Sequence, residues 1–281
     1  MVKVSAIQMS MLEDKSANIK KADKLVRDSA LNGAQIILLP ELFSSLYFCK
    51  DMDKKYFTLA TELKNNELIK HFSDLAKELD VVILVSYFEK SKEGYFNSLV
   101  VIDADGSIMD NYRKTHIPDG AGYEEKFYFK PGNTGFIVYN TSYAKIGVGI
   151  CWDQWFCETA RALSLKGAEI IFYPTAIGSE PEIKLDSKEH WQRVQMGHAA
   201  TNTVPVVVAN RIGKEDGESC SLTFYGSSFI TDYTGAKIAE ASRDEEEIIY
   251  AEFDLIQIQK QRDYWGLLRD RVPESYGALL I

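Results

Sequence analysis

The sequence predicts an α/β protein with the architecture of a four-layer α-β-β-α sandwich, built from two internally related halves. Three pairs of similar segments lead to this prediction: 3–9 with 145–151, 33–40 with 167–174, and 97–106 with 226–235. The pairs occur in the same order along the chain and at similar offsets, as expected of an internal duplication. The alternative is that the pattern GAxIIxxP, shared by 33–40 and 167–174, is only a common helix-to-strand junction.

The first half follows a pattern of strand, helix and strand. Apolar residues recur at helical spacing between 17 and 30, and Gly33 stands where a glycine often follows the end of a helix. Residues 36–39 form the continuous apolar run of a strand that is covered on both faces. The remaining predicted elements are a helix over 67–79, a strand over 81–87, and a hairpin with strands 97–103 and 107–115 around a turn at 104–106.

The second half repeats the pattern. Its predicted elements are a strand ending at 150, helices over 156–166 and 189–202, strands over 170–173 and 204–209, and a hairpin from 227 with its turn at 233–235. Two such halves give two mixed sheets packed face to face, with helices on the outside. We treat 1–281 as a single domain whose last residues, 262–281, form an amphipathic tail.

Composition excludes several classes of function. The formal net charge of -9 over 281 residues argues against nucleic-acid binding, which needs a basic face, and weakly favours a small cationic partner. The four cysteines, at 49, 151, 157 and 220, include no CxxC pair and indicate reduced thiols. Neither a signal peptide nor a run of about 18 apolar residues is present, so we expect a cytoplasmic protein that does not bind a membrane. No cluster has metal-ligand spacing, and we expect neither a metal nor a cofactor.

Three chemically capable residues stand at the ends of predicted strands. Cys151 follows a strand and precedes a helix, whose N-terminus would favour the thiolate. Glu41 follows the run 36–39 and Pro40, and a carboxylate there can exchange protons. Lys114, late in the first hairpin, can stabilise a developing oxyanion. Each residue alone is more readily a packed thiol or a solvated charge than a functional group, but the duplication favours a common site at the strand ends.

At these positions the chain resembles the nitrilase superfamily, over nearly its whole length from Val2 to about Tyr276. The motifs that carry the resemblance are LLPELF at 38–43, YRKTH at 112–116 and GICWD at 149–153. The resemblance implies that Glu41 is the general base, Lys114 the transition-state stabiliser and Cys151 the nucleophile. It also implies that the backbone N–H of Trp152 completes the oxyanion site. A second glutamate common in the family is matched by Glu125, and less well by Glu124.

Within the superfamily, four further segments resemble the N-carbamoylputrescine amidohydrolases: 116–120, 173–181, 190–193 and 265–271. The resemblance implies hydrolysis of this carbamoyl amine to putrescine, carbon dioxide and ammonia. The cationic end of such a substrate needs an acidic or aromatic partner. The candidates are Glu180, which ranks first, Asp119, Tyr123 and Trp152. One departure is Cys157, where the family usually has proline.

Other interpretations stay open. An omega-amidase or an N-carbamoyl-β-alanine hydrolase would act on a carboxylate substrate and would need Arg or Lys in its pocket. A Cys-His hydrolase would use His116 or His198 as the base, and a non-catalytic scaffold or binding protein would keep only the fold. The tail 262–281 can close over its own domain or reach a second subunit. The family resemblance favours the second arrangement, in a homo-oligomer built from dimers.

Overall fold

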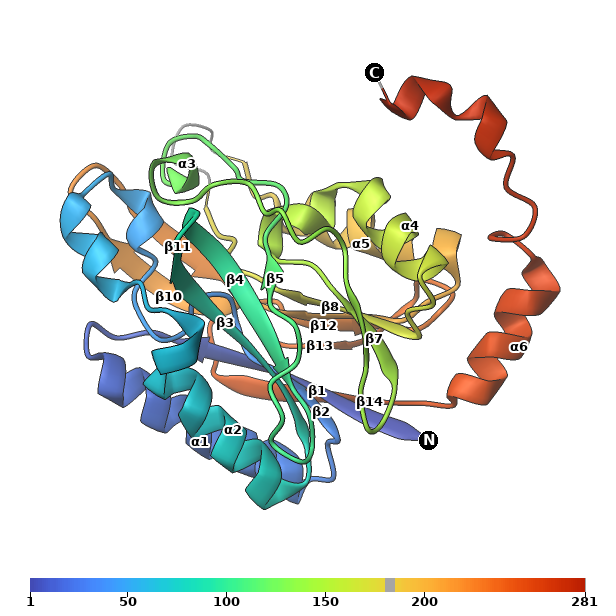
Figure 1. The fold of residues 1–281 in the computed structure, drawn as a ribbon, viewed down its shortest axis with the longest axis horizontal. Coiled ribbons are helices and arrows are strands. Elements are labelled where there is room, and N and C mark those ends of the chain that lie inside the picture. The colour runs from blue at the N-terminus through green and yellow to red at the C-terminus, as the bar shows by residue number, and fades with distance from the viewer. Residues whose placement is uncertain (180–184, 281) are drawn as a thin grey trace.

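The computed structural model describes residues 1–179 and 185–280, and it contains two mixed β-sheets stacked between helices (Figure 1). The first sheet has eight strands in the order β11-β10-β1-β2-β3-β4-β5, with β14 also paired to β1. The second sheet has six strands in the order β13-β12-β9-β8-β7-β6. The predicted four-layer sandwich is therefore confirmed.

The strands of the first sheet are β1 Val2–Ser10, β2 Ile36–Leu38, β3 Val82–Ser91, β4 Gly94–Ile102, β5 Tyr112–Arg113, β10 Arg211–Asp216, β11 Ser221–Tyr225 and β14 Glu247–Phe253. Those of the second are β6 Val138–Asn140, β7 Lys145–Val148, β8 Ile170–Pro174, β9 Val206–Ala209, β12 Phe229–Thr231 and β13 Lys237–Glu240. The α-helices are α1 Lys15–Leu31, α2 Glu67–Leu79, α3 Glu125–Tyr128, α4 Cys157–Leu165, α5 Lys188–Asn202 and α6 Leu255–Trp265. Short 3-10 turns include η1 Phe48–Lys50 and η4 Cys151–Trp155.

The two halves have the same topology. The strand path β14-β1-β2-β3-β4-β5 of the first sheet corresponds to the path β6-β7-β8-β9-β12-β13 of the second. In both paths the second, third and fourth strands are parallel, and the other neighbours are antiparallel. The helices α1 and α2 connect the parallel strands of the first half, and α4 and α5 those of the second. This correspondence confirms the internal duplication.

Alternation along the strands assigns the side chains to three layers of core. In β2, Ile36 and Leu38 face the other sheet, while Ile37 faces α1 and α2. In β8, Ile170 and Phe172 face the first sheet, while Ile171 faces α4 and α5. All of these side chains are fully buried, and each contributes about 1.5–3 kcal/mol relative to an exposed position. The continuous apolar runs of the sequence thus serve two cores at once.

Capping groups set the ends of the predicted helices. Asp14 accepts hydrogen bonds from the N–H groups of Ser16 and Ala17 at the start of α1. Asn66 does the same for α2, which spans the 67–79 predicted from the sequence. The second-half helices also lie close to their predicted ranges. Side-chain caps thus define the starts of α1 and α2, whereas α4 and α5 begin without one.

The hairpin prediction for 107–115 is wrong in extent. Only Tyr112 and Arg113 form a strand there, although Ile108 makes an isolated antiparallel bridge to Ile102 close to the turn. Glycine at 132 secures the next step of the chain: its N–H donates to the carbonyl of Lys114 at 2.7 Å. A Cβ on Gly132 would lie 2.1 Å from the carbonyl oxygen of Arg113, so only glycine fits. The backbone that carries Lys114 is therefore fixed on both sides.

Six elements were not predicted: β6, β10, β11, β14, α3 and α6. Several are short or carry charged and polar residues, and the strands β10 and β14 are defined by a partner, β1, that lies far away in the chain. The strand β14, for example, pairs with β1 across the register Val2↔Phe253 to Gln8↔Glu247. Among the helices of 1–179 and 185–280, none combines the length and apolar character needed to cross a bilayer.

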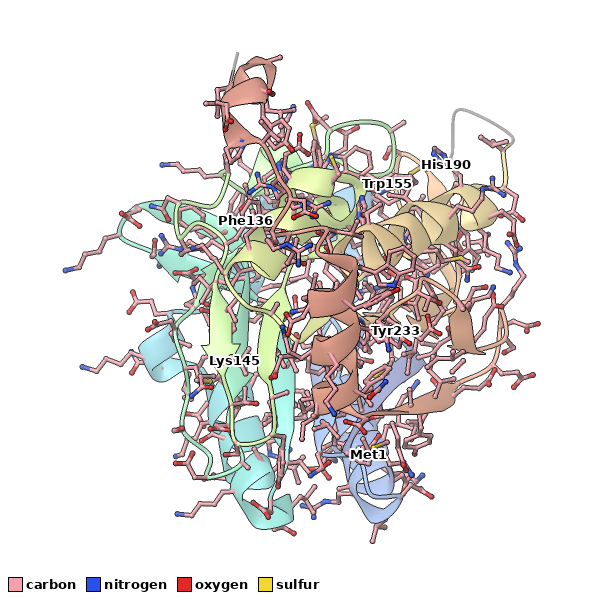
Figure 2. The ribbon with its side chains drawn as sticks, turned by 90° about the vertical axis from the view of Figure 1, so that its right-hand side faces the viewer. Met1, Phe136, Lys145, Trp155, His190 and Tyr233 are labelled. Atoms are coloured by element: carbon pink, nitrogen blue, oxygen red, sulfur yellow. The ribbon has the colours of Figure 1, made fainter. Side chains whose placement is uncertain are left out.

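The C-terminal tail lies apart from the two sheets. The helix α6 and the residues after it run past α4 and away from the sandwich (Figure 1), and Figure 2 looks onto this side of the molecule. The guanidinium of Arg262 anchors α6 by donating to the carbonyl of Thr203 at 3.2 Å. Beyond this anchor Tyr264 is 81% exposed and Trp265 is 61% exposed. The tail thus presents large apolar side chains that its own domain does not cover.

Candidate active site

The three sequence-predicted residues with catalytic chemistry lie after strands of both sheets. Glu41 follows β2, Lys114 follows β5, and Cys151 follows β7 as the first residue of η4. The loops after β2 and β8 meet, because the N–H of Glu41 donates to the carbonyl of Thr175 at 3.4 Å. The carboxyl ends of the strands therefore supply the site, as is usual for sheets with parallel strands.

A buried ammonium lies at the centre of the site. The Nζ of Lys114 donates to Oε1 of Glu41 at 2.9 Å and to Oε1 and Oε2 of Glu125 at 2.9 and 2.7 Å. All three side chains are fully buried. Burial lowers the pKa of Lys114, but the two carboxylates outweigh it and hold the pKa well above its usual value. The lysine therefore stays charged at neutral pH.

The two oxygens of Glu41 have different surroundings. Oε1 accepts from Lys114 and also from Nδ2 of Asn97 at 2.7 Å. Oε2 is buried and has no hydrogen-bond partner among the described residues. An unsatisfied buried acceptor costs about 1–3 kcal/mol, so its persistence points to use rather than to stability. This oxygen is therefore available to accept a hydrogen bond or a proton.

Glu125, on the short helix α3, completes the cluster from the other side. Its Oε1 accepts from the hydroxyl of Tyr47 at 2.7 Å in addition to Lys114. Burial raises the pKa of Glu125, while Lys114 opposes the rise and Glu41 adds to it. No sequence pattern pointed to Tyr47 as a member of the site. Asn97 begins a predicted strand, but its contact with Glu41 depends on tertiary pairing.

Cys151 occupies a strained turn. Its φ of 40° lies in the left-handed region, which costs a non-glycine residue about 1–2 kcal/mol. The side chain is 6% exposed, and Sγ lies 3.7 Å from the carbonyl oxygen of Ala176. This combination of strain and near-complete burial is typical of a functional position rather than of simple packing.

The protonation state of Cys151 corrects the expectation of a thiolate. Burial raises the pKa of the thiol well above its usual value, and Glu41 raises it further, while Lys114 opposes the rise. The predicted help from a helix N-terminus is small, because η4 is a single 3-10 turn and α4 begins only at Cys157. These surroundings favour the thiol over the thiolate.

The four candidate substrate-binding residues lie in different surroundings. Trp152 is 37% exposed beside the nucleophile, and the hydroxyl of Tyr123 accepts from the N–H of Gly178 at 3.0 Å. Asp119 is exposed and forms an ion pair with Lys126 at 3.7 Å, so it does not join the buried cluster. Glu180 lies outside the described residues.

The two histidines of the Cys-His alternative have other partners or surroundings. Nδ1 of His116 lies 2.8 Å from Oδ1 of Asp153, and its ring stacks on Phe156 with centroids 3.7 Å apart. His198 is buried in α5, where burial lowers its pKa to about 4. Among the described residues, neither forms a hydrogen bond to Sγ of Cys151. Within residues 1–179 and 185–280, no group of three or more His, Cys, Asp or Glu side chains could hold a metal ion.

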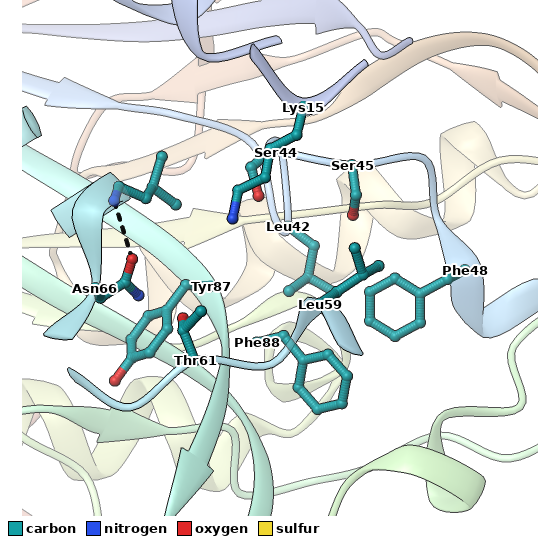
Figure 3. Close-up of a pocket in the computed structure, with 11 residues that line it drawn as sticks. Lys15, Leu42, Ser44, Ser45, Phe48, Leu59, Thr61, Asn66, Tyr87 and Phe88 are labelled. Atoms are coloured by element: carbon teal, nitrogen blue, oxygen red, sulfur yellow. Dashed lines mark hydrogen bonds between the residues drawn. The ribbon is translucent and has the colours of Figure 1, made fainter. Parts of the chain in front are cut away.

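A small cavity lies behind the loop that carries Glu41 (Figure 3). Its volume is about 20 Å³, which is room for one water molecule. Leu42, Phe48, Asn66 and Phe88 are among the residues that line it. Leu42 has a φ of 48° and donates its N–H to Oγ of Ser86 at 3.1 Å. The cavity is too small for an organic substrate, so it is not the binding pocket.

The chain matches a family of hydrolases that act on carbon–nitrogen bonds. Residues 3–263 match the family described as "Carbon-nitrogen hydrolase". The chain therefore belongs to the carbon-nitrogen hydrolase family, and the resemblance to the nitrilase superfamily is confirmed. The enzyme class predicted from the sequence is confirmed with it.

Individual relatives cover nearly the whole chain. It is 53% identical to a citrullinase of Francisella tularensis subsp. tularensis, over 99% of this chain and 98% of that protein. It is 52% identical to an N-carbamoylputrescine amidase of Arabidopsis thaliana, over 99% of this chain and 95% of that protein. A crystal structure of a carbon-nitrogen hydrolase from Helicobacter pylori superposes with a TM-score of 0.92 at 39% identity, covering 100% and 98% of the two chains.

Replacing Lys114 with Met should destabilise the protein by about 3–5 kcal/mol near neutral pH, because two buried carboxylates lose their cation. Without the lysine, these carboxyls bind protons more tightly in the folded than in the unfolded state. The deficit should therefore shrink as the pH falls from about 7.5 to about 5.5. Urea unfolding of wild type and variant at both pH values measures it.

Lys55→Met is the matched control, because Lys55 is an exposed lysine that also faces two carboxylates, Asp53 and Glu218. Its removal should change the free energy of unfolding by less than about 1 kcal/mol at either pH. A Lys114→Met protein with the stability of this control would contradict the charge balance described for the cluster.

Proposed function

We propose that this protein hydrolyses the ureido group of N-carbamoylputrescine, with Cys151 as nucleophile, Glu41 as general base and Lys114 as the cation that stabilises the transition state. The observation that carries the proposal is the unpartnered Oε2 of Glu41. The other carboxylate oxygen, Oε1, accepts hydrogen bonds from Lys114 and Asn97. These bonds orient the carboxylate and leave Oε2 available to accept a proton. A buried thiol with a raised pKa needs such an acceptor.

The reaction takes two stages. In the first, Oε2 of Glu41 accepts the thiol proton while Sγ of Cys151 attacks the carbamoyl carbon. The oxyanion receives hydrogen bonds from Nζ of Lys114 and the N–H of Trp152. As the C–N bond to putrescine breaks, Glu41 returns the proton to the leaving amine, and an S-carbamoyl enzyme remains.

In the second stage, Glu41 takes a proton from water, and the hydroxide attacks the S-carbamoyl carbon. The C–S bond breaks, the sulfur leaves as thiolate, and Glu41 returns the proton to it. The carbamic acid released decomposes to carbon dioxide and ammonia. Glu125 does not exchange protons in this scheme. Its own carboxylate, the second beside Lys114, holds the ammonium in place, which the 2.7 Å contact between Nζ of Lys114 and Oε2 of Glu125 supports.

The substrate class is supported by the relatives. One relative, at 52% identity, is an N-carbamoylputrescine amidase. Its substrate carries a ureido group at one end and an ammonium at the other. A citrullinase at 53% identity makes citrulline a second candidate. Citrulline carries the same ureido group but ends in both an ammonium and a carboxylate. A scaffold without catalysis has less support, because it would gain nothing from a strained cysteine and an unsatisfied carboxyl oxygen.

Intact-protein mass spectrometry tests the nucleophile and the base. Glu41→Gln incubated with N-carbamoylputrescine should lose turnover, because both the attack by Cys151 and the hydrolysis of the intermediate have lost their base, and any carbamoyl group that forms on Cys151 should persist. Its kcat should fall about 10²–10⁴-fold. Cys151→Ala should show no adduct and no turnover, whereas Glu158→Gln, an exposed carboxylate near the same turn, should behave like wild type. Full turnover by Cys151→Ala would end the proposal.

Kinetics with three ureido compounds test the substrate. We expect kcat/KM for N-carbamoylputrescine to exceed that for N-carbamoyl-β-alanine by at least about 10²-fold, since the latter buries an unpaired carboxylate. Citrulline is the third compound, and a higher kcat/KM for it would favour the second candidate. Glu180→Gln should raise KM for N-carbamoylputrescine, while Glu218→Gln, an exposed control, should not. An unchanged KM in Glu180→Gln would remove this residue from the binding site.

We also propose that the tail joins two copies of the chain in a homo-oligomer built from dimers. The exposed Trp265 and Leu267 support this, as does a hollow of about 440 Å³ between the tail and α4, lined by residues that include Arg161, Asn202 and Tyr276. A Trp265→Asp, Leu267→Asp double variant should lower the molar mass measured by light scattering. Leu31→Asp, 84% exposed at the end of α1, is the control and should not. A wild-type monomer would contradict the proposal.

A further inference from the structure

A buried carboxylate outside the Lys114 cluster binds two of the catalytic segments together. Asp153 is fully buried, and its Oδ2 accepts from the N–H of Ile150 at 2.9 Å and from the hydroxyl of Tyr112 at 2.7 Å. Its Oδ1 accepts from the N–H of His116 at 2.9 Å and lies 2.8 Å from Nδ1 of the same residue. Both oxygens are thus fully used, in contrast to those of Glu41.

These contacts bracket the two reactive side chains. Tyr112 and His116 stand on either side of Lys114 in the chain, and Ile150 and Asp153 stand on either side of Cys151. The carboxylate of Asp153 therefore forms a hydrogen-bonded bridge between the segment that carries Lys114 and the segment that carries Cys151. The spacing between the sulfur and the ammonium depends on this bridge.

Packing leaves the bridge little freedom. A Cβ on Gly149 would lie 3.1 Å from Cβ of Asp153 and 2.7 Å from the ring of Tyr173, so the chain passes the carboxylate at close range. On the other side, the ring of His116 stacks on Phe156 at an interplanar angle of 6°. A carboxylate held by four donors in such surroundings has a single orientation, and it can keep the positive φ of Cys151 in place.

We propose that Asp153 is a positioning residue that sets the spacing between the nucleophile and the transition-state cation, with His116 as its hydrogen-bond donor rather than as a base. The inference rests on the proposed roles of Cys151 and Lys114. Asp153 and His116 do not contact the substrate in this scheme. They act on the rate only through the geometry of the two segments.

The first test is Asp153→Asn, in which one acceptor oxygen becomes an amide nitrogen that faces donors. We expect kcat to fall about 10²-fold, as a displacement near 1 Å produces, with KM changed by less than about threefold. Asp103→Asn is the matched control, because Asp103 also accepts two backbone N–H groups, from Ala104 and Ser142, outside the cluster. Equal kcat values in the two variants would overturn the proposal.

The second test separates positioning from base catalysis and remains available if Asp153→Asn fails to fold. His116→Asn keeps an N–H donor near the position of Nδ1 but cannot act as a base at neutral pH, and His116→Ala keeps neither. We expect His116→Asn to retain kcat within about threefold and His116→Ala to lose about tenfold or more, by the same displacement argument. Equal losses in both variants would overturn the donor role.

The alkylation rate of Cys151 by iodoacetamide supplies a readout that a purely structural role would not move. It should fall in Asp153→Asn and His116→Ala at temperatures well below the unfolding midpoint of each variant. Full turnover by Cys151→Ala would mean that the proposed function is wrong. Loss of turnover in Cys151→Ala together with unchanged kcat and alkylation in Asp153→Asn would mean that only the positioning inference is wrong.

Discussion

The molecule depends on one buried ammonium held between two carboxylates. Lys114 contacts Glu41 on one side and Glu125 on the other, and none of the three side chains reaches solvent. Burying these charges is costly unless they are paired, so each of the three segments that carry them is fixed by the other two. The surrounding contacts of Asn97, Tyr47 and Gly132 all serve to hold this arrangement.

The duplication brings the segments together without making them equivalent. Glu41 follows β2, and its counterpart in the repeat is Thr175, after β8; these two residues touch through a backbone hydrogen bond. Cys151 follows β7, whose counterpart is β1. Glu41 and Cys151 therefore come from different positions of the two halves. The fold brings the carboxyl ends of strands from both halves together, and each half contributes different side chains there.

The sequence was sufficient for the local and periodic features. The apolar strands and helix α2 follow from patterns within about twenty residues of chain, and the related halves follow from similar segments repeated along it. The polar strands β10 and β14 do not, because their partner β1 lies far away in the chain. The state of the Cys151 thiol escaped prediction for the same reason, since its pKa depends on burial and on Glu41, which no local pattern reveals.

The single unpartnered oxygen of Glu41 has a consequence for the whole catalytic cycle. Under the proposed roles, the proton that leaves sulfur departs with the amine, and the proton that restores the sulfur comes from the attacking water. Both transfers pass through one atom, so the enzyme finishes each turnover in the charge state in which it began. A site whose charged groups are buried can then complete the cycle without an external proton relay.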